Sequence, residues 1–470
     1  MKMKIKTTTF HDIVILALMT VCAVLFRNST WVINNCYYVI TFASLSLMML
    51  SLAQLKKIGA KILSFSGIFL ILLHLFCLGN YYVKAFGREE FFLFGDWFRN
   101  DIDVKAEAGF FSLCAIEAIF VGMLLYLERE KDVAGADYKR FIRFDSEQKK
   151  RIIYITGVIL LCITLPCRLY VDYSNILTSS VNGEYAGFSG VVGVIDDIQT
   201  LFIPSLICLM YGKRENRGFC RMILILYSIF CIVVMAASGS RRYYVTAIIT
   251  IVLFYINSRP VIKERRNPII YILIALEAIV ILNLMTMIRS YRHTALGINY
   301  LVNEHGSDLF SLDFLWESFS EFGLTGNVVY YARKFFPESV SYQLGYTYLA
   351  SFIYILPIGW FVRLQASIGS ILFKLSGAAV GGSIVADLFA NWGWFSIIPA
   401  ILLGNIIARI AFADANSNQS SVRTAVSYAT SYALLNYVRA STSEIMRYTA
   451  YTMIAIYFIS RFVSSRFRKV

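Results

Sequence analysis

The chain has 470 residues, of which 58% are hydrophobic and only 16% are charged. A soluble domain carries about a quarter charged residues, so this composition excludes an ordinary soluble protein and is typical of a helical membrane protein. The formal net charge of +14 would suggest nucleic acid for a soluble protein. Here most of the basic excess lies in short connections between apolar runs, which membrane topology explains better. We therefore expect the lipid bilayer, and no nucleic acid, as a partner.

Apolar runs recur along the whole chain and leave no part over for a soluble domain, so residues 1–470 are predicted to form a single all-α membrane domain. The runs lie near 12–27, 31–54, 62–83, 106–127, 152–169, 189–211, 222–238, 243–257, 268–288, 383–411, 424–439 and 446–462. Alternate connections are rich in Lys and Arg, from Lys56 and Lys57 to the tail that begins at Arg461. Because positive charge is kept on the cytoplasmic side, this alternation places both termini in the cytoplasm.

The stretch 346–380 decides the number of spans. A single crossing there would move the basic tail to the outer side, so the stretch crosses the bilayer either not at all or twice. Pro357, Gly359 and Arg363 interrupt it. We favour an interfacial or re-entrant segment, which gives about 12 spans, and a hairpin would give 14. Residues 289–382 are then one large outer loop, and a connection of this length is usually functional.

Several arginines stand at the outer boundary of the predicted spans, where positive charge is unusual. Arg241 and Arg242 belong to the very short turn SGSRR at 238–242, between two apolar runs. The others are Arg168, Arg289, Arg292, Arg439 and Arg447. Arginine presents a planar fork of donors that suits phosphate, so we predict that several span ends hold one diphosphate. The alternative for each arginine is snorkelling to lipid phosphates, or pairing with an acid such as Glu444 or Asp172.

Four groups are candidates for a general base that removes a proton from an attacking hydroxyl. Asp387 lies near the outer end of an apolar run, where an ionisable side chain is costly and is a functional candidate by default. Its alternative role is that of a structural partner for an arginine or a helix terminus. Glu317 and Glu321 are four residues apart and would share a helix face, and His293 follows two outer arginines. For most acids of the large loop the alternative is an ordinary solvated position.

Aromatic side chains are plentiful, and 15% of the residues are Phe, Trp or Tyr. Some are expected in interfacial belts, and others are candidates to stack on sugar rings. The candidate sugar-binding residues are Trp316, Tyr330 and Trp392. No GxxxxGK[ST], HExxH or GxSxG motif occurs, and the cysteines show no metal-ligand spacing, so we predict no cofactor and no metal. His74, inside an apolar run, is expected to be a hydrogen-bonded core residue.

The turn SGSR at 238–241 resembles the arginine turn of Wzy-type polysaccharide repeat-unit polymerases and their ligase relatives. The second half of the chain strengthens this likeness through an ordered set of short motifs. These are EFGLT at 321–325, YQLGYTYL at 342–349, GGS at 381–383, NWG at 391–393 and YVR at 437–439, followed by Arg447. From about residue 230 to 450 the chain is similar to the O-antigen polysaccharide polymerase family.

The resemblance implies a metal-independent, inverting glycosyltransferase with a GT-C-like fold in the bacterial cytoplasmic membrane. Its substrates would be undecaprenyl-diphosphate-linked oligosaccharides at the outer leaflet, and its product a surface polysaccharide of the lipopolysaccharide or capsule kind. A chain-length regulator is a further candidate partner. By position, Arg241, Arg289, Arg439 and Arg447 match the family's arginines. At the position of Asp387 the resemblance leads us to expect a glutamate, whose side chain is one methylene longer than that of aspartate.

Two other functions remain open at this point. A ligase that transfers finished chains to another lipid acceptor would use arginines in the same way. A flippase or transporter of lipid-linked oligosaccharides would need charges along an internal pathway and short loops on both sides. The long outer loop and the nearly charge-free interiors of the predicted spans argue against the transporter.

Overall fold

The computed structural model describes residues 7–26, 29–60, 63–91, 101–135, 147–182, 193–238, 242–257, 313–356, 367–377, 380–411 and 421–467. In this part of the chain the predicted all-α class is confirmed. The helices of the first half are α1 (Thr7–Phe26), α2 (Thr30–Asn34), α3 (Cys36–Lys57), α4 (Phe65–Ala85), η1 (Glu89–Phe91), α5 (Ile102–Gly135), α7 (Glu147–Asn182), α8 (Val194–Gln199), α9 (Phe202–Gly212), α10 (Arg217–Ser238) and α11 (Arg242–Asn257). Those of the second half are α14 (Asp313–Phe335), α15 (Tyr346–Ile355), α16 (Ile368–Ser376), α17 (Ile384–Trp392), η5 (Gly393–Ser396), α18 (Ile397–Ala411), α19 (Ser421–Asn436) and α20 (Thr442–Phe467).

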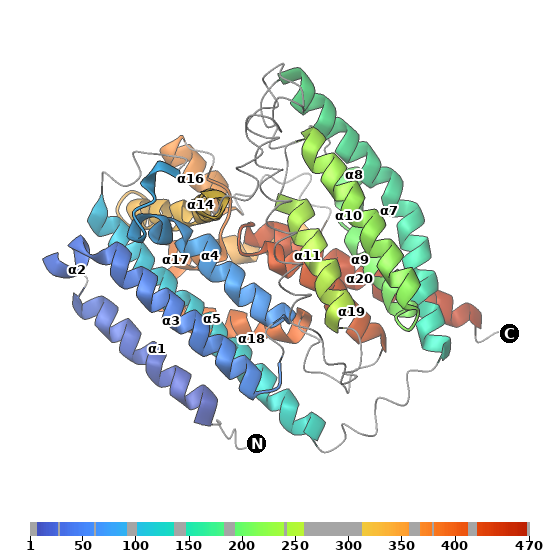
Figure 1. The fold of residues 1–470 in the computed structure, drawn as a ribbon, viewed down its shortest axis with the longest axis horizontal. Coiled ribbons are helices and arrows are strands. Elements are labelled where there is room, and N and C mark those ends of the chain that lie inside the picture. Colours follow the sequence, from blue (N-terminus) through green and yellow to red (C-terminus); the bar gives the residue numbers. More distant parts are fainter. Residues whose placement is uncertain are drawn as a thin grey trace.

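The helices form two groups that lie side by side (Figure 1). In the first group α5 packs along α18 and α1, while α4 packs along α3 and α14. In the second group α7 packs along α9 and α10, and α10 packs against α11. Helix α19 contacts α18 on one side and α9 and α11 on the other, so it joins the two groups. Helix α20 follows α19 and packs on α7 and α15.

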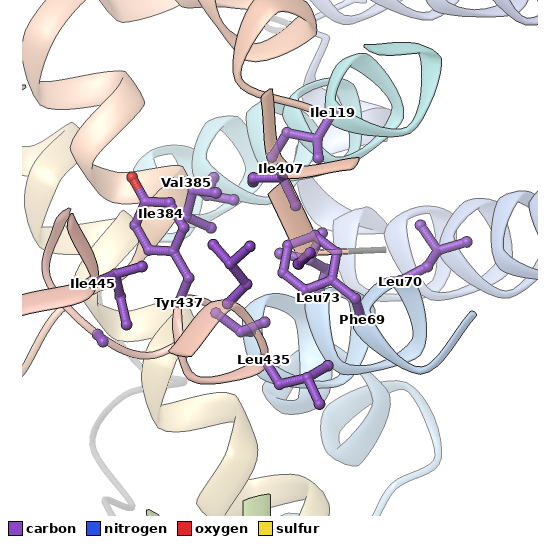
Figure 2. Close-up of a cluster of buried hydrophobic side chains, with 14 of the residues drawn as sticks. Phe69, Leu70, Leu73, Ile119, Ile384, Val385, Ile407, Leu435, Tyr437 and Ile445 are labelled. Carbon is purple, nitrogen blue, oxygen red and sulfur yellow. The ribbon is translucent and has the colours of Figure 1, made fainter. Parts of the chain in front are cut away.

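An apolar core lies where the first group meets α17 to α20 (Figure 2). It brings Phe69 of α4 and Ile119 of α5 together with Ile384, Ile407 and Ile445, all at most 2% exposed. This core packs around the start of α17 and the turn between α19 and α20. Those two segments are therefore held rigidly against the rest of the bundle.

The closest helix pairs meet at glycines. A Cβ at Gly122 of α5 would overlap the backbone oxygen of Ile401, and a Cβ at Gly404 of α18 would overlap that of Ile119. Helix α14 approaches α4 in the same manner at Gly323. Small residues let helix backbones come close in a membrane, where packing rather than water drives association. The sequence specifies these close contacts by placing glycine, which has no side chain, at each of them.

Part of the predicted outer loop at 289–382 is a packed helix, α14. Its residues 313–335 form a regular helix that packs on α4, α5 and α17, and Val328 and Ala332 are fully buried. This stretch of the predicted loop is therefore a packed helix, on which Asp313 is exposed and Glu317 and Glu321 are half-buried. The buried face of α14 contains small and mildly polar residues such as Ser320 and Gly323, so hydropathy alone does not distinguish it from a loop.

Seven helical stretches in the described part of the chain are long and apolar enough to cross a membrane. They are Cys36–Lys57, Phe65–Ala85, Ile102–Arg129, Glu147–Thr178, Val194–Gly212, Arg217–Met235 and Ile384–Ala411. Shorter apolar helices occur at Thr9–Leu25, Tyr243–Asn257 and Tyr346–Ile355. The expected run at 268–288 lies outside the described residues. A polytopic membrane protein is thus supported, and the number of about 12 spans stays a prediction.

The described helices within 346–380 are short. Helix α15 has 10 residues and α16 has nine, so each is about 15 Å long or less. The hydrocarbon core of a bilayer is about 30 Å thick, and neither helix crosses it alone. Helix α15 nevertheless exposes large apolar side chains, among them Leu349 at 66% and Phe352 at 59%. Short length with apolar exposure fits an interfacial or re-entrant segment better than a full span.

Polar contacts between helix ends follow the predicted alternation of sides. Lys150, near the start of α7, pairs with Glu215 in the turn between α9 and α10, and both belong to basic connections. At the opposite ends, the hydroxyl of Tyr243 near the start of α11 donates to Glu444 near the start of α20. Each contact joins ends that the charge pattern assigns to one side of the membrane.

Candidate functional site

The structure describes only some of the predicted diphosphate ligands. Arg241, Arg289, Arg292 and His293 lie outside the described residues. Arg242 is the first residue of α11, and its backbone alone is described. The site is therefore built from the helix ends that flank the 239–241 turn and from the late arginines.

The start of α11 is tied to the α19–α20 turn, which contains Arg439. The hydroxyl of Thr246 donates to the side-chain oxygen of Asn436 at 2.9 Å, and that of Tyr243 donates to Glu444 at 2.9 Å. These bonds reach from one end of the α19–α20 turn to the other, across about 190 to 200 positions of sequence. The start of α11, which follows Arg241 in the chain, thus lies next to the turn that contains Arg439.

Arg168 of α7 is a paired, largely buried arginine. Its Nε lies 2.9 Å from a carboxylate oxygen of Asp172, and its Nη1 donates to Gln199 at 2.8 Å. Its guanidinium also lies over the ring of Tyr244, 4.8 Å from the centroid. The other oxygen of Asp172 accepts the Tyr244 hydroxyl at 2.5 Å. Pairing with Asp172, the alternative foreseen for Arg168, is confirmed.

Arg447 of α20 has an acidic neighbour that the sequence did not reveal. Its Nε lies 3.3 Å from a carboxylate oxygen of Asp197, at the start of α8. The side chain of Arg447 is 25% exposed and that of Asp197 is 9% exposed. A phosphate that binds Arg447 would share the guanidinium with Asp197 or displace it. The pair could not be found from spacing, because the two residues are 250 positions apart.

Asp387 is a fully buried side chain in the first turn of α17. One carboxylate oxygen accepts two hydrogen bonds from Thr442, from the backbone N–H at 3.1 Å and from the hydroxyl at 2.5 Å. The Thr442 hydroxyl also lies 2.9 Å from that of Tyr437. Thr442 is the first residue of α20. The alternative foreseen for Asp387, a partner for a helix terminus, is confirmed.

Two motifs of the second half meet through Asn391. Its side-chain oxygen accepts the N–H of Gly345 at 2.9 Å, and its amide nitrogen donates to the hydroxyl of Thr347 at 2.7 Å. Trp392 stacks on Tyr348 with 5.2 Å between ring centroids. Sequence reasoning gave no role to Asn391, Thr442 or Tyr348. Asn391 and Tyr348 belong to the NWG and YQLGYTYL motifs of the family resemblance, whereas Thr442 stands in the polar stretch ASTSE with no distinguishing context.

The predicted sugar-binding aromatics lie in different surroundings. Tyr330 is 6% exposed and donates its hydroxyl to Asp101 at 2.6 Å. Trp316 packs against Phe86 at 5.3 Å, and one face of Trp392 is occupied by Tyr348. Glu317 and Glu321, two of the other candidate bases, lie one turn apart on α14, as their spacing predicted, and both are half-buried.

A second charged cluster joins α5 to α14. Arg333 pairs with Glu107 at 2.7 Å and with Glu338 at 2.9 Å, while Lys334 pairs with Asp101 at 2.5 Å. Hydrogen bonds from Lys334, and then from Tyr330, lower the pKa of the Asp101 carboxyl. The cluster fixes the end of α14 to the start of α5. In the described part of the chain, no three His, Cys, Asp or Glu side chains are grouped so as to hold a metal ion.

The sequence profile of the O-antigen polysaccharide polymerase Wzy family matches residues 8–469, nearly the whole chain. The chain belongs to this family. Membership extends the resemblance seen over 230–450 to the first 220 residues, which matched only in hydropathy. It implies an O-antigen repeat-unit polymerase, a glycosyltransferase-like enzyme that acts on lipid-linked oligosaccharide repeat units in a membrane. No curated protein and no solved structure gave a match in the same comparisons.

Proposed function

We propose that this Wzy family member polymerises undecaprenyl-diphosphate-linked repeat units on the outer face of the bacterial cytoplasmic membrane, by inverting and metal-independent glycosyl transfer. The observation that supports it best is that hydrogen bonds from the start of α11, which follows Arg241 in the chain, reach both sides of the α19–α20 turn, which contains Arg439. Both termini lie in the cytoplasm in this proposal, the membrane fold is GT-C-like, and a chain-length regulator is an additional partner.

In the proposed reaction, a hydroxyl at the non-reducing end of an incoming repeat unit attacks the anomeric carbon of the growing chain. The new glycosidic bond forms as the bond from that carbon to the lipid diphosphate breaks, and the anomeric configuration inverts. The hydroxyl proton passes to a base, and undecaprenyl diphosphate leaves. Because the leaving group gathers negative charge, cationic side chains placed beside it stabilise the transition state.

The outer arginines supply this charge. Arg241 and Arg439 are the first choice, since bonds from the start of α11, which follows Arg241 in the chain, reach both sides of the turn that contains Arg439. Arg289 and Arg447 complete the set. Arg242 and Arg292 are secondary candidates. Forked guanidinium groups suit a diphosphate because each can donate two parallel hydrogen bonds.

For the base, complete burial removes Asp387 from contact with an acceptor sugar. The remaining candidates are Glu317 and Glu321 on α14, and His293. Both glutamates are on a helix whose C-terminal end is fixed by the Arg333 cluster, so their positions relative to α4 and α5 are well defined. A weak base suffices, because the diphosphate is a good leaving group and positioning accounts for much of the rate.

Purified protein given only lipid-linked repeat units tests the proposal. Formation of a polymer ladder is expected. No polymer, with transfer to a second lipid when that lipid is added, would instead identify a ligase, and movement across vesicles without a new bond would identify a flippase. The variants Arg241→Ala and Arg439→Ala should lose long products while still inserting into the membrane. Arg461→Ala, an exposed arginine at the other end of α20, is the matched control.

A further inference from the structure

Asp387 is placed to orient the arginine-bearing turn rather than to exchange protons with a sugar. Its side chain is fully buried, between the GGS segment that precedes α17 and the start of α20. A general base must reach the proton that it removes, within about 3 Å or through one water. Asp387 reaches Thr442 instead, through two hydrogen bonds to one carboxylate oxygen.

The carboxylate lies at the N-terminal ends of two helices at once. It is in the first turn of α17, whose N-cap is Ser383, and it accepts the backbone N–H of the first residue of α20. Helix N-termini carry partial positive charge and unpaired N–H groups, and both favour a nearby anion. Asp387 therefore stabilises α17 and caps α20 from a separate element.

What this cap holds in place is the turn that contains Arg439. Gly382 lies against the same turn so closely that a Cβ there would come within 2.5 Å of the backbone of Ala440 and Ser441. The Tyr437 hydroxyl joins the network through Thr442. The turn is thus enclosed on the α17 side by a backbone contact and by a charge-assisted hydrogen bond.

From this turn the contacts continue to α11. Asn436, at the end of α19, accepts a bond from Thr246, and Glu444, in the first turn of α20, accepts one from Tyr243. A shift of the α20 start would therefore also disturb the segment that follows Arg241. We propose that Asp387 is a positioning residue: through Thr442 it fixes the start of α20 and so orients Arg439 toward the diphosphate of the lipid-linked substrate.

The expected effect on KM rests on the proposed function. The expected effect on the rigidity of the α20 start rests on the geometry alone. The structural consequence is measured first, without substrate, as amide hydrogen exchange of the 438–447 segment. Asp387→Ala and Thr442→Val should both accelerate exchange there. Thr442→Ser, which keeps the hydroxyl, should behave like the wild type. Thr449→Val is the matched control on α20, because the Thr449 hydroxyl accepts or donates no hydrogen bond in the described part of the chain.

The kinetic test uses lipid-linked repeat units and a double-mutant cycle. Loss of one charge-assisted hydrogen bond corresponds to about a tenfold change, so Asp387→Asn and Thr442→Val should each raise KM for the lipid-linked substrate about tenfold. The double variant should be no worse than the stronger single one, because the hydroxyl bond that Thr442→Val removes ends on the same carboxylate that Asp387→Asn neutralises, while the backbone N–H of residue 442 is kept in both. The acidic limb of the pH–rate profile should survive in Asp387→Asn.

Two results would overturn the inference. A kcat for Asp387→Asn that falls about a hundredfold or more at unchanged KM, with loss of the acidic limb, would make Asp387 the general base. Unchanged exchange of the 438–447 segment in Asp387→Ala would show that it positions nothing. If the wild type makes no polymer, the proposed function fails, while the exchange experiment still reports whether Asp387 holds the turn.

Discussion

Replacement of Arg168 by methionine should cost stability rather than substrate binding. The guanidinium of Arg168 is 12% exposed and the Asp172 carboxylate 3% exposed, at an Nε–Oδ2 distance of 2.9 Å. Methionine leaves Asp172 as a buried charge without its cation. Removing one partner of a buried ion pair costs about 3–5 kcal/mol of unfolding free energy. The hydrogen bond from Arg168 to Gln199 belongs to the same network, so its loss is not added to that cost.

The double variant Arg168→Met/Asp172→Leu supplies the internal control. Removing both charges avoids the stranded carboxylate, and such replacements are often close to neutral. Here the Tyr244 hydroxyl would still lose its acceptor, at about 1–3 kcal/mol, so the double variant should be less destabilised than the single one. The assay is the free energy of unfolding in a detergent titration, with polymer formation measured on the folded fraction. A stable but inactive Arg168→Met would refute this reasoning and make Arg168 a substrate ligand.

Two further predictions concern packing and pH. Gly122→Ala should destabilise the bundle by about 1–3 kcal/mol because its Cβ would meet backbone of α18. Gly218→Ala, whose Cβ would make only an ordinary contact of 3.5 Å with the side-chain oxygen of Asn216, should stay within about 0.5 kcal/mol in the same unfolding assay. The pKa of Asp101 is lowered in the fold by Lys334, so its ion pair contributes stability above about pH 4 and loses it as pH falls through the lowered pKa. The difference in unfolding free energy between wild type and Asp101→Asn should therefore shrink in acid. Equal losses in the two glycine variants, or a difference that grows in acid, would contradict these expectations.

The sequence predicted the helical class, which the structure confirms, and it indicates an alternation of helix ends that stays a prediction; both inferences depend on local composition. Runs of apolar residues mark helices that enter the bilayer, and basic connections mark one side. Helix α14 shows where local composition fails. Ser320 is buried, and Gly323 and Gly326 lie against the backbone of α4, but a hydropathy average over 313–335 cannot separate a helix packed inside protein from a solvated loop.

At the candidate site, residue chemistry was more predictable than residue partners. The cost of an ionisable side chain in an apolar run identified Asp387 as significant. Its partner Thr442 follows α19 by only a few positions and has no distinguishing sequence context. The same holds for Asp197 opposite Arg447, since long-range pairs are set by tertiary packing. The sequence pattern therefore identified the charged residues, and only the structure shows which of them are paired.

The pairing of Arg447 leads to a test of how the site accepts an anion. If the diphosphate shares or displaces Asp197, the ion pair opposes binding, and Asp197→Asn should remove that competition. An ion pair at partial exposure is worth about 1 kcal/mol at most, so KM for the lipid-linked substrate should fall by up to about fivefold.

Asp196→Asn is the matched control, because Asp196 is adjacent in sequence and accepts from Gln199 at 3.1 Å. It should leave KM nearly unchanged. A rise in KM for Asp197→Asn, with unfolding stability unaltered, would mean that Asp197 orients Arg447 for the diphosphate instead of competing with it. In that case the Arg447–Asp197 pair would be a pre-organised part of the site, and Arg447 would rank with Arg439 among the ligands.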